Sequence, residues 1–269
     1  MPGTGETAED AIDPMAVTAV RGLTGSLRLR ARLCGGRTIL ADVSRTAPFA
    51  VGPPSRRDPE RAQVIVQQVG PGLMPGDDLA IEITVERGAR LLVRGQSAAK
   101  IYPCPAGVFA EVRTVLTVET GGELAFLPGE LISFAGSACR QRTSVRLAGD
   151  ARFAMTEIVT AGRIAAGERD RYRELDLRLR IVVDGRTLLI ERNHLEPMRR
   201  PLTAVGRHSE FAVAATEYRH GHPCRHPDVI EVEAGIGGSG WMDGLEIARV
   251  LSSNVQNARV ALDRGVFRD

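Results

Sequence analysis

Apolar and polar residues alternate along two stretches of the chain, and this alternation predicts β-strands. In residues 79–85, leucine, isoleucine and valine occupy every second position, which is the pattern of a half-buried strand. Residues 175–183 repeat the pattern and are followed by Asp184-Gly185 and a second apolar run. A two-residue Asp-Gly connection favours a tight hairpin because both turn positions adopt positive φ. We therefore predict a strand over residues 79–85 and a β-hairpin centred on residues 184–185.

A strand, a glycine-containing turn and a second strand recur at a spacing of roughly thirty residues. The recurring segments are residues 85–91, 118–124 and, more loosely, 147–153. Units of this kind bury their apolar faces by stacking on one another. The predicted fold class is mainly β, a layered or solenoid-like array of stacked β-hairpins. An ordinary β-sandwich is the alternative, because glycine turns also recur there.

The sequence predicts one or two helices toward the C-terminus. Ser253 or Asn254 can cap the clearest one, Ala258 and Leu262 fall on one side of it, and Gly265 can end it. Residues 1–14 contain four acidic residues and no Lys or Arg, and we interpret them as a flexible leader. Residues 53–60 are rich in proline and charge and predict an exposed loop. Residues 15–269 are expected to form a single β domain.

Composition narrows the classes of function. The net charge is +2 and aromatic residues make up 4% of the chain, so no nucleic-acid surface is expected. No apolar run approaches eighteen residues, which excludes a transmembrane helix, and the acidic leader does not resemble a secretory signal. We expect a cytoplasmic protein. Its cysteines are far apart, form no CxxC pair and are expected to be free thiols: Cys34, Cys104, Cys139 and Cys224.

Familiar catalytic spacings are missing, so we do not expect an enzyme. The sequence has no nucleophile elbow, phosphate-binding loop, dinucleotide fingerprint or HExxH motif. Two short segments still carry candidate chemistry. Residues 70–79 place Asp77 after a glycine- and proline-rich stretch, where it could instead simply cap a tight turn. Residues 96–102 contain Lys100, the one lysine of the chain, which could instead protect an edge strand.

Two further segments carry groups that could meet a cation. Residues 157–168 place Glu157, Arg163 and Glu168 around two glycines, so they could line a polar channel or form a structural ion pair. Residues 220–227 place imidazole or thiol groups at alternate positions, and such ligands suit nickel, copper or zinc. The candidate ligands in this second segment are His220, His222, Cys224 and His226. Because two prolines interrupt it, a solvent-exposed turn is the alternative.

In their order along the chain, the first three of these segments, together with residues 127–134, resemble the UreD family of urease accessory proteins, named UreH in some species. Residues 220–227 match no motif of the family. Residues 70–79 resemble the family's glycine-rich GD element, and residues 96–102 resemble its QxxxKxY element. Residues 127–134 resemble its Leu-Pro-x-Glu stretch, and residues 157–168 resemble its E-x4-GR-x-A-x-GE signature. The resemblance covers roughly residues 60–195, and the C-terminal third matches more loosely.

The resemblance implies a non-catalytic scaffold for nickel insertion into apo-urease, with a mostly β fold. It implies the accessory proteins UreF and UreG and the apo-urease subunits as partners. It also implies an internal tunnel that passes nickel in transit, without a tightly bound cofactor. The motif positions carried over are Asp77, Gln96, Lys100, Tyr102, Glu157, Arg163 and Glu168.

This chain departs from the family pattern at two positions. Gly95 and Ala99 stand where the family usually has threonine, so two hydroxyl groups are absent. Two other classes of function remain open. One is a small metal-dependent hydrolase that uses His220, His222 and His226 as ligands and Glu157 or Glu168 as base. The other is a β-solenoid binding module for carbohydrate or protein.

Overall fold

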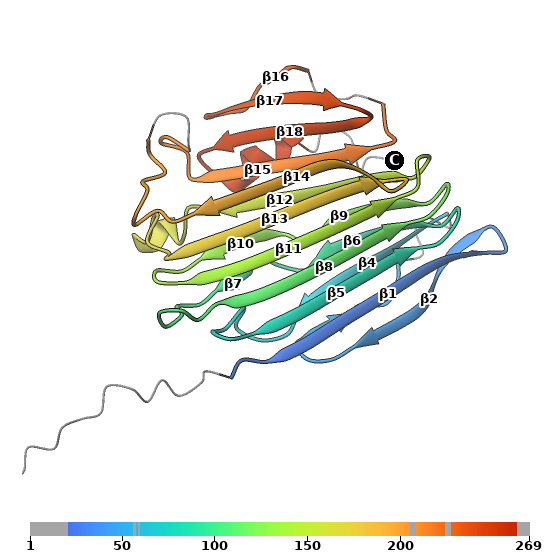
Figure 1. Ribbon diagram of the computed structural model, residues 1–269, viewed down its shortest axis with the longest axis horizontal. Coiled ribbons are helices and arrows are strands. Elements are labelled where there is room, and N and C mark those ends of the chain that lie inside the picture. The colour runs from blue at the N-terminus through green and yellow to red at the C-terminus, as the bar shows by residue number, and fades with distance from the viewer. Residues whose placement is uncertain (1–20, 56–57, 59, 205–207, 224–226, 263–269) are drawn as a thin grey trace, which may run out of the picture.

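Two β-sheets stacked face to face make up most of the molecule (Figure 1). The computed structural model describes residues 21–55, 58, 60–204, 208–223 and 227–262. The predicted leader, residues 1–14, lies outside them, as do positions 56, 57 and 59 of the predicted loop. In spatial order, the seven-stranded sheet contains β14 (Arg186–Leu195), β13 (Glu174–Val183), β11 (Ala138–Leu147), β8 (Ala110–Val118), β5 (Asp78–Val85), β1 (Thr24–Cys34) and β2 (Arg37–Arg45).

The second sheet has eleven strands. Its main path contains β16 (Val229–Ile230), β17 (Gly235–Met242), β18 (Leu245–Ser252), β15 (Val213–His220), β12 (Arg152–Thr160), β9 (Glu123–Leu127), β6 (Arg90–Gly95), β4 (Arg61–Gln68) and β3 (Phe49–Val51). A side branch adds β10 (Glu130–Ser133), which pairs with β12, and β7 (Ala99–Ile101), which pairs with β10. The main core lies between the two sheets and takes buried side chains from both, such as Leu29, Leu116, Leu91 and Phe153.

The mainly β, solenoid-like prediction is confirmed, and the repeating unit is an arch. The turns after β5, β8 and β11 each carry the chain from the seven-stranded sheet to the eleven-stranded sheet. The two strands of one repeat therefore pair with equivalent strands of the next repeat and not with each other. Val85, Val118 and Leu147 form one such parallel row, immediately before the three turns. Stacking buries these rows in a common core, as the repeat predicts.

The local predictions at residues 79–85 and 184–185 are also confirmed. Residues 79–85 lie in β5, and Asp184 and Gly185 connect β13 to β14 as an antiparallel hairpin with φ of 47° and 80°. In the helix α1 (Val255–Leu262), the Asn254 side chain accepts a hydrogen bond of 2.8 Å from the backbone N–H of Asn257. Asn254 is thus the cap, whereas Gly265 lies outside the described residues. The buried face of the helix covers the outer side of β15 and β18.

Three of the four cysteines can be assessed. Cys34, Cys104 and Cys139 are free thiols, as predicted, and Cys224 lies outside the described residues. Burial raises the pKa of Cys139 to about 12, so this thiol stays protonated and is a poor metal ligand at neutral pH. Across the described part of the chain, every helix is too short or too polar to span a membrane.

Candidate functional site

Four segments carry the family motifs: residues 70–79, 96–102, 127–134 and 157–168. They lie side by side at one end of the stacked sheets. The backbone N–H of Leu73 donates to the carbonyl of Lys100 at 2.7 Å, and Tyr102 donates back to Leu73 at 2.9 Å. Strand β7 then pairs with β10, and β10 pairs with β12, which carries Glu157. A residue larger than glycine would not fit at Gly72, because its Cβ would lie 2.3 Å from the Lys100 carbonyl oxygen. Segments that are up to ninety residues apart in sequence therefore form one continuous surface.

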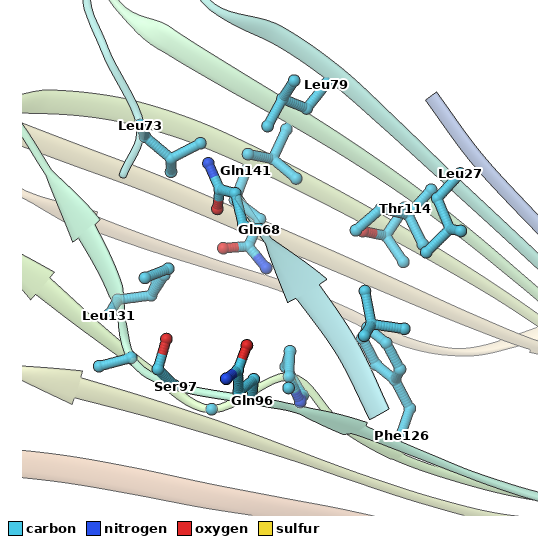
Figure 2. Close-up of a pocket in the computed structure, with 18 of the residues that line it drawn as sticks. Leu27, Gln68, Leu73, Leu79, Gln96, Ser97, Thr114, Phe126, Leu131 and Gln141 are labelled. Carbon is cyan, nitrogen blue, oxygen red and sulfur yellow. The ribbon is translucent and has the colours of Figure 1, made fainter. Parts of the chain in front are cut away.

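A cavity of about 160 Å³ lies between the sheets beneath this surface. Its walls are mainly aliphatic, but amide, hydroxyl and carboxylate groups also face it: Gln68, Gln96, Gln141, Thr114, Thr143 and Glu157. Figure 2 shows the amides of Gln68 and Gln141 turned into this space. The Gln68 Nε2 is buried without a hydrogen-bond partner, and a group in that condition is best satisfied by a polar species inside the cavity.

The motif residues of the first two segments have different positions relative to this cavity. Gln96 and Lys100 both border it, and both are exposed on the outer side. Asp77 is buried elsewhere, and its carboxylate accepts hydrogen bonds of 2.8 Å from the N–H groups of Leu23 and Met74. Asp77 therefore caps the turn, which is the structural alternative considered for it.

Gly95 explains one departure from the family pattern. A Cβ at this position would lie 2.1 Å from the carbonyl oxygen of Pro128. A threonine at residue 95 would require the backbone at Pro128 to move. The missing hydroxyl therefore accompanies close backbone packing between the end of β6 and the turn after β9.

Glu157 is the carboxylate on the inner face of β12. Met155 and Val159, two residues before and after it on the same face of the strand, belong to the core between the sheets. Burial, and to a lesser extent the nearby Glu191 carboxylate, raise the pKa of Glu157 to about 7. A hydrogen bond with Asn193 and the charge of Arg249 act in the opposite direction. Glu157 thus exchanges its proton near neutral pH.

A second cavity of about 590 Å³ lies on the other side of Glu157. Glu191 and Asn193 of β14 and Arg249 of β18 contribute polar groups to it. Glu157 borders both cavities. Tyr218 contacts the same region, and its pKa is raised by burial and by the charge of Glu157, so its hydroxyl remains protonated. The arrangement places one titratable carboxylate between two cavities.

Tyr102, Arg163 and Glu168 come together, but at the surface and not around Glu157. The Arg163 guanidinium lies 4.1 Å from the centre of the Phe134 ring, and Tyr102 packs on the same ring at 4.8 Å. Glu168 accepts hydrogen bonds from Arg163 and from the N–H of Ala135, which lower its pKa to about 2. The structure does not bring Glu168 to the cavities that Glu157 borders, so a polar channel lined by both carboxylates stays a prediction. Strand β12 ends at Thr160, and the turn through η1 (Ile164–Ala166) carries Glu168 outward as a structural ion pair.

The histidine segment is only partly described. His220 ends β15, is buried, and donates from Nδ1 to the carbonyl of Ala151 at 3.1 Å. The alternative prediction of a solvent-exposed turn is therefore wrong for His220, because this residue is buried and is the last residue of the strand. Cys224 and His226 lie outside the described residues, so the proposed ligand set His220, His222, Cys224 and His226 stays a prediction. The described geometry does not assemble the hydrolase arrangement either, since Glu157 lies in the interior and Glu168 is held by Arg163.

Two groups of polar residues were missed in the sequence. One consists of Glu191, Asn193 and Arg249 beside Glu157. The other consists of Glu174, His194 and Glu196, the group of possible metal ligands found among the described residues. The hairpin signal could have indicated the second group, because pairing about residues 184–185 brings residue 174 next to residues 194–196.

Comparisons with known proteins agree with the arrangement of the motifs. The model of the family described as UreD urease accessory protein matches residues 23–268. Urease accessory protein UreD of Acetivibrio thermocellus is 31% identical over 69% of this chain and 71% of its own length. The UreD proteins of Sorangium cellulosum and Klebsiella aerogenes are 32% and 31% identical, each over 65% of this chain. The matches span 55% and 65% of those two relatives, less than two thirds of each. Since the family model spans nearly the whole described structure, the chain belongs to the UreD family of urease accessory proteins.

Proposed function

We propose that this protein is a non-catalytic scaffold in urease maturation that passes nickel to apo-urease through its interior. The observation that carries the proposal is Glu157, which stands between two cavities and has a pKa of about 7. At pH 7, a carboxylate with this pKa is protonated in about half of the molecules, and it can release its proton when a divalent cation binds. It can take the proton back when the cation leaves, so the cation is not trapped.

The lining of the first cavity suits such transient binding. Amide and hydroxyl oxygens supply weak ligands, and Glu157 supplies one ionisable ligand. The aliphatic walls add no strong ligand, and the protonated thiol of Cys139 does not compete for the ion. A conducting path needs sites that are favourable enough to enter and weak enough to leave. On this proposal, nickel is cargo and the protein has no resident cofactor.

The scaffold part of the proposal concerns partners. Membership of the UreD family and the surface formed by the four motif segments support binding of the accessory proteins UreF and UreG and docking on apo-urease. A cytoplasmic location follows from this role, because urease would be assembled there.

The test is reconstitution in cells that express the urease subunits with UreF and UreG. With this chain present, purified urease should contain nickel and be active, and a tag on the chain should capture UreF, UreG and urease. Without it, urease should be purified largely without nickel. Equal nickel content in both preparations, together with no captured partner, would contradict the proposal.

A further inference from the structure

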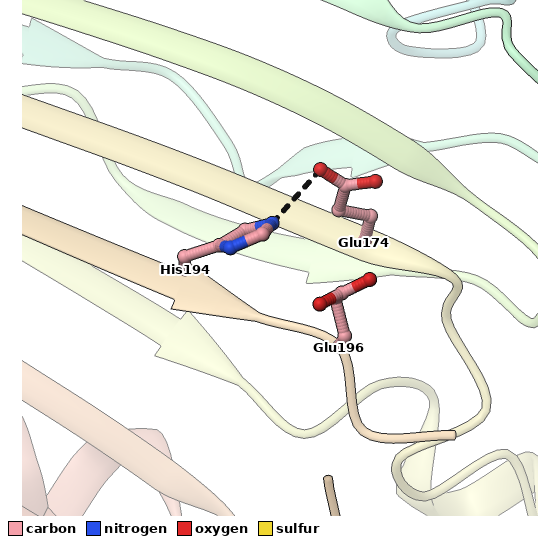
Figure 3. A group of neighbouring side chains, drawn as sticks. All are labelled: Glu174, His194 and Glu196. Carbon is pink, nitrogen blue, oxygen red and sulfur yellow. Dashed lines mark hydrogen bonds and ion pairs between the residues drawn. The ribbon is translucent and has the colours of Figure 1, made fainter. Parts of the chain in front are cut away.

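A second, separate group of candidate metal ligands lies on the outer face of the seven-stranded sheet. Glu174 begins β13, His194 lies near the end of β14, and Glu196 follows that strand (Figure 3). His194 Nε2 lies 2.9 Å from Glu174 Oε1, and one ligand atom from each of the three residues falls within 4.8 Å of the others. Alternation along β13 places Glu174 on the face opposite the buried Leu175 and Leu177, and therefore away from the core.

We propose that Glu174, His194 and Glu196 bind a divalent transition-metal ion of the Ni²⁺ or Zn²⁺ type. An imidazole nitrogen favours such ions over Mg²⁺ or Ca²⁺, which prefer oxygen ligands alone. Two carboxylates and a neutral imidazole carry a charge that balances a divalent cation. Because ligand bonds to these ions are about 2.0–2.2 Å, two ligand atoms at tetrahedral angles on one ion lie about 3.3–3.6 Å apart. The ligand atoms lie within 4.8 Å of one another, so the side chains need to close by at most about 1.5 Å.

The surrounding charges leave these three groups available. Asp176 stands opposite His194 in the strand register, but both of its oxygens accept hydrogen bonds from Arg178 and Arg192. Asp176 is therefore occupied, and it holds the Arg192 guanidinium on its own carboxylate. Glu196 pairs with Arg199 at 3.0 Å, but the Arg199 side chain is 79% exposed. An exposed pair of this kind is weak, and an ion can displace it.

The hairpin gives the site its geometry. Asp184 and Gly185 fix the register of β13 against β14, and that register brings Glu174 close to His194. Two of the three ligands, Glu174 and His194, come from paired strands, where side chains are more rigidly placed than on loops. The inference does not depend on the proposed nickel route, because these side chains face outward and their binding is measured without urease. His194 also borders the second cavity, so the ion would lie beside its wall.

The experiment measures Ni²⁺ and Zn²⁺ binding to the purified full-length chain by equilibrium dialysis, with excess Mg²⁺ to occupy sites built only from oxygen ligands. The variants are His194→Ala and Glu196→Gln. Glu111→Gln is the matched control, because Glu111 is a half-buried carboxylate of β8 that pairs with arginines. A combined His222→Ala and His226→Ala variant tests the histidine segment. Circular dichroism checks that each variant folds.

We expect one ion per chain, and a loss of affinity of at least about tenfold in both His194→Ala and Glu196→Gln. Glu111→Gln and the variant of the histidine segment should keep this ion. Unchanged stoichiometry and affinity in His194→Ala and Glu196→Gln would overturn the proposal. Loss of the ion only in the variant of the histidine segment would also overturn it.

Discussion

Arg249 of β18 donates a hydrogen bond to Glu191 of β14, with 2.6 Å between Nη2 and Oε2. This pair connects the two sheets directly beside Glu157. Because Arg249 is engaged by Glu191, its charge offsets the burial of Glu157 only in part. The consequence is a carboxylate with a pKa of about 7 in the interior.

The raised pKa predicts how stability depends on pH. Glu157 titrates near 4.5 when unfolded and near 7 when folded, so the folded state binds more protons between these values. Its contribution to stability therefore falls as pH rises from 4.5 to 7 and stays low above 7. The total loss in the free energy of unfolding is on the order of 3 kcal/mol. Urea denaturation at pH 5 and pH 8 measures most of this loss.

Glu157→Gln should remove this dependence and make the protein more stable at pH 8 than the wild type. The amide has nearly the same shape and carries no charge to desolvate. Glu111→Gln is the control, since it makes the same chemical change outside the cavities. If the free energy of unfolding changed with pH in the same way in the wild type and in Glu157→Gln, Glu157 would not be the titrating group.

Gly95 provides a prediction about packing. Gly95→Ala should destabilise the fold by about 1–3 kcal/mol or more, because the new Cβ would overlap the Pro128 carbonyl. Gly240→Ala is the matched control in another strand, where a Cβ meets no atom within 4 Å. It should change the free energy of unfolding by within about 0.5 kcal/mol. Similar unfolding midpoints for the two variants would contradict the close approach at Gly95.

His220 and His222 should respond differently to substitution. His220→Ala removes a buried ring and leaves the Ala151 carbonyl without its donor, which should cost about 1–3 kcal/mol. His222 is half-buried in the turn that follows, so His222→Ala should cost less. Thermal unfolding of the two variants checks the order. A larger loss of stability in His222→Ala would mean that the turn, and not the end of β15, holds this region.

The surface ion pair should not control nickel transfer. Glu168 is held by Arg163 and the Ala135 amide, so it has no ligand role toward an ion in the cavities. Urease matured with Glu168→Gln should therefore keep its nickel content. Because the pKa of Glu168 is about 2, this behaviour should not change between pH 6 and pH 8. A large fall in nickel content with an intact complex would assign Glu168 to the route.

Local features of the fold could be predicted from the sequence because they depend on nearby residues. The strand at 79–85 follows from alternation, the hairpin at 184–185 from Asp-Gly, and the helix start from Asn254. The arches could not be predicted, because a glycine turn looks the same whether its two strands pair together or diverge into separate sheets. Only the long-range register of Val85, Val118 and Leu147 distinguishes these cases.

The candidate site was predictable only in part for the same reason. The motif order indicated that residues 70–79, 96–102 and 157–168 belong together, and the structure brings these segments side by side. The sequence did not reveal that Glu157 faces inward while Glu168 leaves the strand, since this depends on where β12 ends. The partners of Glu157 come from β14 and β18, and pairing across two sheets leaves no signal in a local window.

The nickel content of urease matured with the Glu157→Gln variant tests the central claim most directly. Urease is purified after maturation with wild-type chain, Glu157→Gln or Glu111→Gln, nickel per active site is measured by mass spectrometry, and captured UreF is compared in parallel. The account predicts at least a several-fold loss of nickel with Glu157→Gln, none with Glu111→Gln, and equal capture of UreF in all three. Full nickel content with Glu157→Gln would contradict a route through the interior carboxylate.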